Sequence, residues 1–300
     1  MTVLELIEAG ARQLAHAGVA FGHGTSNAFD EAAWLVLWQL DLPLDTPLDG
    51  PQHDPDGVAN QAVAPEKQAQ VAALLAKRIS ARQPAAYLTR EAWLQGVPFY
   101  VDERAIVPRS FIAELLCNGT IDYWLGESTR QVLDLCTGNA SLAVLAALSY
   151  PEVTVDATDI SPDALAVARI NVDKHGLQQR ITLLLSDGLS GVRGPYDLIL
   201  CNPPYVNAHS MAALPPEYHA EPALALDGNA RGGSDGMDFI RSLLRDAPQH
   251  MSEHAVLVLE IGNERAHFEA AFPRLEAVWL ETSAGEDQVL LLTREALLHL

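Results

Sequence analysis

The spacing of hydrophobic positions along this 300-residue chain changes near residue 130 and predicts two differently built parts. Before that point, apolar residues recur with the period of a helix over residues 2–17, 28–40 and 65–82. The stretch 41–65 is rich in Pro, Asp and Gly, which predicts a long loop between the second helix and the third. We therefore expect a small helical domain over residues 1–85.

The pattern of a hairpin follows the predicted helical domain. Gly96 separates two short apolar runs, as a turn residue does between paired strands. Ser110 then suits the N-cap of a helix that ends near Trp124. We expect residues 86–110 to form a hairpin linker and residues 111–300 to form the second domain.

From residue 130 onward, apolar runs of strand length alternate with helical segments. The predicted strands cover residues 131–135, 153–158, 181–185, 197–201 and 255–261, and a closing hairpin pairs 275–280 with 288–293. The predicted helices between them cover residues 140–149, 162–175, 235–248 and 264–271. Strands separated by helices build βαβ units. The pattern therefore predicts an α/β fold with a doubly wound, mostly parallel sheet that carries helices on both faces.

The charge of the chain restricts its partners. It has 39 acidic and 19 basic residues, a net charge of −20, and no Lys or Arg over residues 13–66 or 194–230. Binding to duplex DNA or to an anionic membrane depends on Lys and Arg, so an acidic surface disfavours both. We expect a basic protein partner, no membrane and no direct nucleic-acid binding; the alternative is that the acidity serves only solubility.

The cysteines indicate a reducing compartment. Cys117, Cys136 and Cys201 are odd in number and lie in apolar contexts, which is typical of reduced thiols in cytoplasmic proteins. No apolar run reaches the roughly 18 residues of a membrane span. No Cys and His spacing suggests a metal site. We expect a cytoplasmic protein without a metal.

Polar residues follow three predicted strands, at the sheet edge where ligands bind in folds of this kind. After the first strand, Asp134-Leu135-Cys136-Thr137-Gly138-Asn139-Ala140 leads into a helix N-terminus, whose backbone N–H groups bind a carboxylate. Asp159 ends the second strand, and its carboxylate suits both hydroxyl groups of a ribose. Asp187 and Gly188 end the third. A single acid after a strand is commonly a helix cap, so the prediction of a cofactor site depends on the three together.

The fourth predicted strand ends in Asn202-Pro203-Pro204-Tyr205. Proline has no backbone N–H, and it pushes the preceding residue into an extended conformation. The segment is therefore a rigid turn that presents an amide side chain, carbonyl oxygens and an aromatic ring. Such a turn would accept both N–H bonds of a planar amino group and pack against its face. The alternative is an ordinary Pro-Pro strand exit. No Gly-x-Gly-x-x-Gly and no Gly-Lys-Ser/Thr supports a nicotinamide enzyme or a P-loop phosphotransferase.

In this order, the segments resemble the S-adenosylmethionine-dependent protein glutamine methyltransferases. The matching motifs are Asp-x-Cys-Thr-Gly, Asp-Ile-Ser-Pro-Asp-Ala-Leu, Ser-Asp and Asn-Pro-Pro-Tyr. Residues 99–104, with Val107-Pro108-Arg109-Ser110, are similar to the branch that modifies large ribosomal subunit protein three. The resemblance extends from about residue 85 to the end and includes the N-terminal helices only loosely.

The resemblance implies the fold, the cofactor and the site residues. The fold is that of a class I S-adenosylmethionine-dependent methyltransferase, and the reaction methylates a glutamine amide nitrogen in ribosomal protein three. Asn202, Pro203 and Tyr205 are implied in catalysis, and Pro204 and Arg109 join them in substrate binding, although Arg109 equally suits a surface ion pair. The implied cofactor-binding residues are Asp134, Cys136, Thr137, Gly138, Asn139, Ala140, Asp159, Asp187, Gly188 and Asn202.

One position departs from the family pattern. The first motif of the family usually has a glycine where this chain has Ala140. The added methyl group would crowd the amino-acid end of the cofactor. We nevertheless expect binding to persist, because the groups of the turn that bind an anion are backbone N–H groups.

The implied reaction needs positioning more than it needs a strong base. An amide nitrogen is a poor nucleophile because its lone pair is shared with the carbonyl. The Asn202 side-chain oxygen and the Pro203 carbonyl would accept the two amide N–H bonds and aim the lone pair at the methyl group. Tyr205 would pack on the amide plane and exclude water.

Three alternatives remain at this point. The release-factor branch of the family shares most of the motifs. An adenine amino methyltransferase poses the same geometric problem with an exocyclic amine, but the acidic charge disfavours it. A binding protein that has lost the cofactor would also keep the fold, with Ala140 as its only support.

Overall fold

The computed structural model describes all of residues 1–300, which form two compact units. The first, here called the helical unit, comprises Met1–Ala92 together with Pro215–Ala220. The second, here called the sheet unit, comprises Trp93–Leu214 and Glu221–Leu300. The sequence did not predict that a short segment from the second half of the chain belongs to the helical unit. No helix is both long and apolar enough to cross a membrane.

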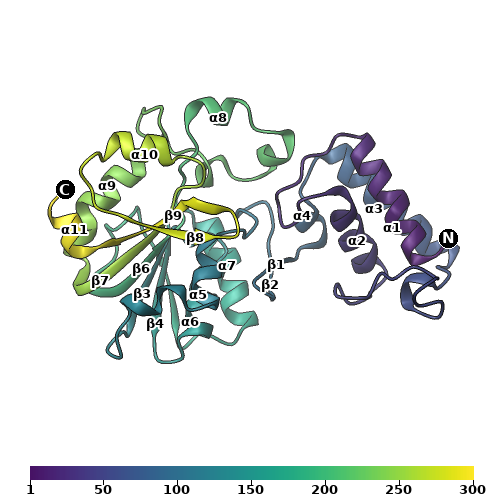
Figure 1. Cartoon of the computed structure of the whole chain (residues 1–300), viewed down its shortest axis with the longest axis horizontal. Coiled ribbons are helices and arrows are strands. Elements are labelled where there is room, and N and C mark those ends of the chain that lie inside the picture. The colour runs from purple at the N-terminus through teal and green to yellow at the C-terminus, as the bar shows by residue number, and fades with distance from the viewer. The chain divides into compact units, whose positions relative to one another are not determined.

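The helical unit contains the three helices that the sequence predicted (Figure 1): α1 (Val3–His16), α2 (Ala28–Gln39) and α3 (Pro65–Ala81). Thr2 caps α1 with a capping box that it forms with Glu5, and the Asn27 side chain caps α2. Pro65 occupies the first turn of α3, where a missing N–H costs nothing. A short α4 (Ala85–Thr89) and a 3-10 turn, η1 (Val58–Asn60), complete this part of the chain.

The predicted hairpin is present as β1 (Ala92–Leu94) and β2 (Val97–Phe99), which form a two-stranded sheet. Gln95 and Gly96 both have positive φ, 49° and 73°. Two such residues make the tight turn that joins short antiparallel strands.

The sheet unit is built on seven strands in the order β5-β4-β3-β6-β7-β9-β8. The strands are β3 (Gln131–Leu135), β4 (Thr154–Asp159), β5 (Ile181–Leu185), β6 (Tyr196–Cys201), β7 (Met251–Glu260), β8 (Val278–Thr282) and β9 (Gly285–Thr293). The pairs from β5 across to β7 are parallel, whereas β9 runs antiparallel to both β7 and β8. Sequence order reverses direction at β3, so the carboxyl ends of β3 and β6 flank a crevice of the kind that binds ligands.

Helices cover both faces of this sheet (Figure 1). One core lies under α5 (Ile112–Cys117), α6 (Ser141–Ser149) and α7 (Pro162–Lys174). The other lies under α9 (Asp238–Asp246), α10 (Arg265–Ala271) and α11 (Arg294–Leu298). The predicted α/β class and the mostly parallel, doubly wound sheet are therefore confirmed.

Several element boundaries differ from the prediction. The helix expected to run from Ser110 to Trp124 is broken, because Gly119 adopts φ 72° after α5 ends and a 3-10 turn, η2 (Thr120–Trp124), follows. The strand expected to begin at Ala255 begins at Met251. Three short elements were not predicted by the sequence: α8 (Ala208–Ala212), η3 (Pro216–Ala220) and η4 (Ala223–Ala225). The helix predicted over residues 235–248 ends in a 3-10 turn, η5 (Ala247–Gln249).

Candidate active site

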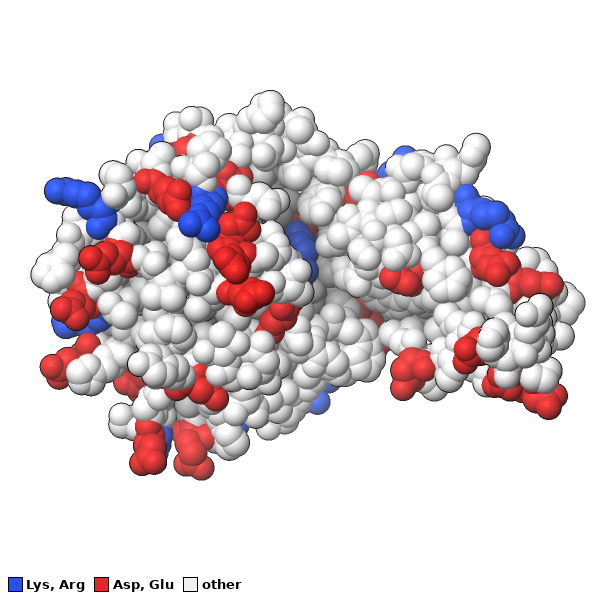
Figure 2. Space-filling view, in the orientation of Figure 1, with Lys and Arg blue, Asp and Glu red and all other residues white.

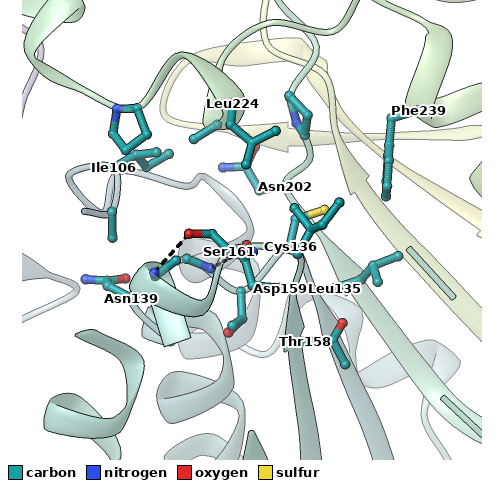
Figure 3. Close-up of a pocket in the computed structure, with 18 of the residues that line it drawn as sticks. Ile106, Leu135, Cys136, Asn139, Thr158, Asp159, Ser161, Asn202, Leu224 and Phe239 are labelled. Atoms are coloured by element: carbon teal, nitrogen blue, oxygen red, sulfur yellow. Dashed lines mark hydrogen bonds between the residues drawn. The ribbon is translucent and has the colours of Figure 1, made fainter. Parts of the chain in front are cut away.

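A cavity of the sheet unit lies where β3, β4, β5 and β6 end, which is the edge that the sequence indicated (Figure 3). The predicted residues that line it are Cys136, Thr137, Gly138, Asn139, Asp159, Asp187, Gly188, Asn202, Pro204 and Arg109. The other four predicted residues lie outside its lining: Asp134, Ala140, Pro203 and Tyr205. Arg104 from the motif 99–104 and segments that the sequence did not single out, notably 105–106 and 222–231, complete the walls.

The turn after β3 is tightly wound. Cys136, Gly138 and Ala140 have φ values of 62°, 56° and 65°, so left-handed residues alternate along it. Asp134 holds this turn from below: its Oδ2 accepts hydrogen bonds from the Thr137 hydroxyl and from the backbone N–H of Ala143. Burial raises the pKa of Asp134 to about 7, although the Thr137 hydrogen bond opposes that shift. Asp134 therefore shapes the turn and does not face the cavity.

Ala140 does not crowd the cavity. Its side chain is fully buried in the core beneath α6 and is absent from the cavity wall. The alanine instead strains the backbone. A left-handed conformation is about 1–2 kcal/mol less favourable for a residue with a Cβ. The expected obstruction at the amino-acid end of the cofactor is therefore not what the structure shows.

Asp159 is fixed by two backbone groups. Its Oδ2 accepts from the N–H of Gly138 at 2.9 Å, and its Oδ1 accepts from the N–H of Ser161 at 2.9 Å. Burial raises the pKa of Asp159, and these backbone hydrogen bonds oppose the shift. A carboxylate oxygen has two lone pairs and can accept more than one hydrogen bond. A rigid carboxylate that lines the cavity suits a pair of neighbouring hydroxyl groups.

The third strand end adds polar and apolar walls. Ser186 closes the turn by donating to the carbonyl of Gly188 at 2.7 Å and accepting from Gly191 N–H at 2.9 Å. Asp187 lines the cavity beside this turn. Phe239, from α9, lines the same cavity (Figure 3). The half-exposed Ile160 (48% exposed) lines it as well. Two apolar side chains with a nearby carboxylate suit a flat heteroaromatic ring with an amino group.

Asn202, at the exit of β6, is oriented by a residue that the sequence analysis missed. Its Nδ2 donates a hydrogen bond to Glu260 Oε1 at 3.2 Å. An ionised carboxylate only accepts hydrogen bonds, so the amide must turn its NH₂ group toward Glu260. The Asn202 Oδ1 is then left on the other side of the amide, and the side chain lines the cavity. Glu260 does not line the cavity, but by holding the NH₂ group it directs the Asn202 oxygen toward the cavity.

Glu260 is itself held firmly at the end of β7. Its Oε2 accepts from the Ser110 hydroxyl and from the Phe111 N–H at 2.9 Å, and the residue is 3% exposed. Burial raises the pKa of Glu260 to about 7, while Ser110 and the N-terminal N–H groups of α5 oppose the shift. Ser110 also accepts from the Ile112 N–H at 3.2 Å, so the residue predicted as a helix cap mainly links α5 to this glutamate.

Tyr205 is positioned by a glycine two residues beyond Glu260. A Cβ on Gly262 would lie 2.6 Å from the Tyr205 ring, so only glycine permits this approach. Gly236 makes a similar approach to the backbone, since its Cβ would lie 2.0 Å from the Tyr205 carbonyl oxygen. Pro203 is buried and Pro204 half-buried. The turn that the sequence predicted to be rigid is therefore packed on two sides.

Arg109 makes the ion pair that the sequence left open, and it also lines the cavity. Its two terminal nitrogens donate to the two oxygens of Glu221, each at 2.7 Å. Glu221 Oε1 accepts in addition from the Val107 N–H at 2.9 Å. The guanidinium is therefore a fixed wall of the cavity.

The motif Phe99 to Arg104 forms a second support. Arg104 donates to both carboxylate oxygens of Asp102, at 2.9 and 2.6 Å, and the Tyr100 hydroxyl donates to the same carboxylate. The carboxylate's pKa is lowered to about 2, because the hydrogen bonds from Arg104 and Tyr100 outweigh its burial. The Asn171 side chain donates to the carbonyls of Tyr100 and Asn139, which ties this motif to the turn after β3.

Comparison with known proteins shows which families this chain resembles. A family model described as methyltransferase small domain matches residues 120–217. The chain is 50% identical over 299 residues to the ribosomal protein uL3 glutamine methyltransferase of Bordetella pertussis, covering 99% of this chain and 96% of that protein. The protein of the same name from Neisseria gonorrhoeae is 46% identical over 300 residues, covering 99% and 96%.

A solved structure shows the same fold at low identity. The catalytic domain of hMettl16, in complex with the MAT2A 3'UTR hairpin 6, superposes with a TM-score of 0.51 at 14% identity. The match covers 76% of this chain and 81% of that one. At this identity, the likeness concerns the fold alone.

The fold and the turns at its sheet edge define a class I S-adenosylmethionine-dependent methyltransferase. Within that class, the chain belongs to the family of ribosomal protein uL3 glutamine methyltransferases, because it matches members at 46–50% identity over nearly its full length. The family, the enzyme class and the cofactor that the sequence indicated are thereby confirmed.

Proposed function

We propose that this protein transfers a methyl group from S-adenosylmethionine to the side-chain amide nitrogen of a glutamine in ribosomal protein uL3. The substrate is the one in the names of the relatives. The observation in this chain that supports the reaction is the orientation of Asn202 by Glu260. It leaves an amide oxygen, and not an amide NH₂, available to an N–H group in the cavity.

The residues of the cavity fit the cofactor. Gly138 lines it, yet a Cβ there would meet nothing within 4 Å, so the wall is open at the turn that would receive the methionine carboxylate. Two lining residues, Asn139 and Thr158, carry buried polar atoms (Nδ2 and Oγ1) without a partner in the protein. Asp159 would bind the ribose hydroxyls, and Ile160 and Phe239 would hold the adenine.

Asn202 and Pro203 would hold the substrate amide. The Asn202 Oδ1 and the Pro203 carbonyl would accept its two N–H bonds, which holds the amide plane so that the nitrogen lone pair points at the methyl group. Bound S-adenosylmethionine supplies a methyl group on a positively charged sulfur: the N–C bond forms as the C–S bond breaks, and a proton leaves the nitrogen for solvent. Such alignment removes an entropic barrier on the order of several kcal/mol. Tyr205 would cover the amide plane.

Glu260 is the positioning residue of this arrangement. It does not line the cavity, and its three hydrogen-bond donors all require an acceptor on the carboxylate. By holding the Asn202 NH₂ group, it prevents the amide flip that would aim a donor at the substrate N–H.

We also propose a role for each part of the chain. Residues 1–85 serve as a substrate-recognition domain, 86–110 as a linker and 111–300 as the methyltransferase domain. The acidic side chains of the long loop are exposed and suit a basic protein (Figure 2); they are Asp41, Asp45, Asp49, Asp54 and Asp56. The second stretch without Lys or Arg does not add to this surface, because Glu217 and Glu221 in it are buried and paired. A cytoplasmic location is part of this proposal, and a ribosomal-protein substrate supports it.

The direct experiment incubates the purified protein with S-adenosylmethionine labelled in its methyl group and with purified uL3. Mass spectrometry of the product should locate one added methyl group on a glutamine side chain. Ribosomal proteins other than uL3, and release factors, serve as competing substrates. Methylation of a release factor in preference to uL3 would move the protein to the other branch, and methylation of neither would refute the proposal.

A further inference from the structure

The two chain segments that leave β6 and β7 continue side by side beyond the end of the sheet. They are residues 202–207, here called the catalytic turn, and residues 260–264, here called the support loop, which leads into α10. Both belong to the sheet unit. The strands are parallel, with Cys201 beside Leu259, so positions 202 and 260 start the two segments next to each other.

Every second residue of the support loop, at positions 260, 262 and 264, contacts the catalytic turn. The first two hold Asn202 by a hydrogen bond and the Tyr205 ring by a close approach. Glu264 makes the third contact. Its Oε1 accepts from Asn207 Nδ2 at 2.7 Å and from the Asn207 backbone N–H at 3.4 Å. A glutamate therefore holds each end of the catalytic turn.

Glu264 is itself fixed in place. It is 5% exposed and is the N-cap residue of α10, which packs on the core through Phe268, 2% exposed. Its Oε2 lies 2.6 Å from His267 Nδ1, so both carboxylate oxygens have a partner. Its backbone N–H donates to the Ile261 carbonyl at 3.1 Å. A hydrogen bond in a buried site is electrostatically stronger than one in water, so Glu264 is a firm anchor for Asn207.

Asn207 uses both ends of its amide. It is 8% exposed, and its Oδ1 accepts from the Ser210 N–H at 2.9 Å, which caps α8. Because Oδ1 serves this cap, the NH₂ group faces Glu264, which accepts from it. Asn207 thereby joins the end of the catalytic turn to the first residues of two helices.

Only Val206 separates this anchor from Tyr205. The Val206 N–H donates to the Leu226 carbonyl at 2.9 Å, and its own carbonyl accepts from the Gly228 N–H at 3.1 Å. Those partners lie in an irregular segment, 226–228, whereas Glu264 begins a helix that packs on the core. The Glu264 contact therefore ties the backbone beside Tyr205 to a regular element.

We infer that Glu264 and Asn207 are positioning residues for methyl transfer, which hold the end of the catalytic turn so that the Tyr205 ring lies over the substrate amide. The inference rests on the proposed function, since it concerns the same site. Glu260 orients the hydrogen-bond acceptor at the start of the turn, and Glu264 places the aromatic cover at its end. One loop thereby aligns both parts of the amide site.

The test compares four variants of the full-length protein: Glu264→Ala, Glu264→Gln, Asn207→Asp and Leu297→Ala. Glu264→Gln keeps an oxygen for Asn207 and turns its NH₂ group to His267 Nδ1, which accepts in one neutral form of the ring. Asn207→Asp breaks the contact from the other side and keeps the oxygen that caps α8. Leu297 is buried in the same core but lies in α11, outside both segments, so its variant controls for lower stability.

Glu264→Ala and Asn207→Asp should each lower kcat on a short glutamine peptide by about tenfold to a hundredfold, as a small misplacement of reacting groups does. Calorimetry should show S-adenosylmethionine affinity close to the parent value, since neither residue lines the cavity. Glu264→Gln should keep most of the parent kcat, and folded Leu297→Ala should keep all of it. A parental kcat in either of the first two variants, or an equal loss in Leu297→Ala, overturns the inference.

A double-mutant cycle tests whether Glu264 acts through Tyr205. Tyr205→Ala should itself lower kcat. Adding Glu264→Ala should lower it by no more than about twofold further, because the side chain that Glu264 positions is already gone. Losses that multiply would show that Glu264 acts elsewhere, which overturns the inference.

Amide hydrogen exchange separates this inference from the proposed function. Exchange over residues 205–210 should be faster in Glu264→Ala than in the parent, because the end of the catalytic turn has lost its anchor. If the parent protein methylates no glutamine, the proposed function fails, whatever the variants do. Unchanged exchange over 205–210 in Glu264→Ala would overturn the anchor by itself, with or without activity.

Discussion

Asn202 and Glu260 end neighbouring parallel strands and are joined by a hydrogen bond of 3.2 Å from Nδ2 to Oε1. The register of β6 and β7 brings them together, with Cys201 beside Leu259. A buried acid outside the cavity lining thus sets which end of the Asn202 amide faces the cavity.

Asp159 should bind the ribose of the cofactor. Asp159→Ala should weaken S-adenosylmethionine binding by about 1.5–3 kcal/mol, the usual value of hydrogen bonds to a charged group. Asp159→Asn is the matched control, since it keeps one acceptor for the backbone N–H groups of Gly138 or Ser161. Calorimetry on folded protein decides the point, and unchanged affinity in Asp159→Ala would return this residue to the role of a turn cap.

Ala140 should be neutral for cofactor binding. Because its side chain lies in the core and not in the cavity wall, Ala140→Gly should leave S-adenosylmethionine affinity at the parent value. Its effect on the free energy of unfolding should also be small, since relief of a strained φ of about 1–2 kcal/mol offsets the lost burial of a methyl group and the greater chain entropy. Much tighter binding in Ala140→Gly would restore the crowding hypothesis.

Activity should rise with pH as Glu260 ionises. The pKa of Glu260 is raised to about 7 by burial, and a proton on Oε1 would displace the NH₂ group of Asn202 as the donor. The kcat should therefore increase through about pH 7. A profile that is flat between roughly pH 6 and 8 would contradict the assigned role.

Stability should change in the opposite direction over the same window. The folded pKa of about 7 lies above the ordinary 4.5, so the folded protein binds more protons there than the unfolded chain. The contribution of Glu260 to the free energy of unfolding therefore falls as pH rises from about 4.5 to about 7. Asp134, whose pKa is also raised to about 7, adds a stability slope of the same sign, so Asp134→Asn is the control that must keep the activity profile.

The acidic loop should accelerate encounter with a basic substrate. Replacing Asp45, Asp49, Asp54 and Asp56 with Asn should slow methylation of intact uL3, mainly in the association rate, and spare a short peptide. Asp41 is left in place because it pairs with Lys67 at 3.2 Å. The difference should shrink as salt rises, because exposed charges are screened beyond about 8 Å at physiological ionic strength.

An equal charge change on the sheet unit provides the control. Four exposed acids lie in or near the β8–β9 hairpin, and their replacement by Asn or Gln should have little effect: Glu276, Glu281, Glu286 and Asp287. If both sets of replacements slow methylation of uL3 equally, the acidic loop acts only through the net charge of the protein.

The sequence predicted the parts of the fold and site that local patterns determine. Strand and helix alternation predicted the sheet, and polar residues at strand ends predicted Asp159, Asp187 and Asn202. Glu260 has the same pattern, an acid at the carboxyl end of a strand, but it was not among the predicted site residues. Its role depends on the pairing of β6 with β7, which sequence spacing alone does not give.

Other features depend on contacts between distant parts of the chain. Glu217 and Arg78 are 139 residues apart, and nothing in their local sequence indicates a buried pair. The acidity of the stretch around Glu217 and Glu221 suggested a charged surface, whereas burial and pairing with arginines remove both residues from it. The Ala140 side chain points into the core because the residue has a left-handed φ of 65°, and alanine as a residue type does not predict that conformation.

The central claim is that Glu260 orients the amide of Asn202, and a double-mutant experiment tests it. Glu260→Gln should let its own NH₂ group face residue 202 and force the Asn202 amide to flip. The kcat should fall by about 10²–10³, as it does when one preorganised partner is lost, while S-adenosylmethionine affinity is retained. The kcat of Asn202→Asp alone should also fall, because the variant brings a second carboxylate next to that of Glu260.

The double variant Glu260→Gln with Asn202→Asp restores a donor facing an acceptor, and it leaves the second oxygen of the introduced carboxylate directed at the cavity. The decisive measurement is therefore kcat on a glutamine substrate for the parent, the two single variants and the double variant. The account predicts that the double variant is more active than either single variant. A double variant no more active than the worse single variant, with all four proteins folded and binding S-adenosylmethionine, would contradict it.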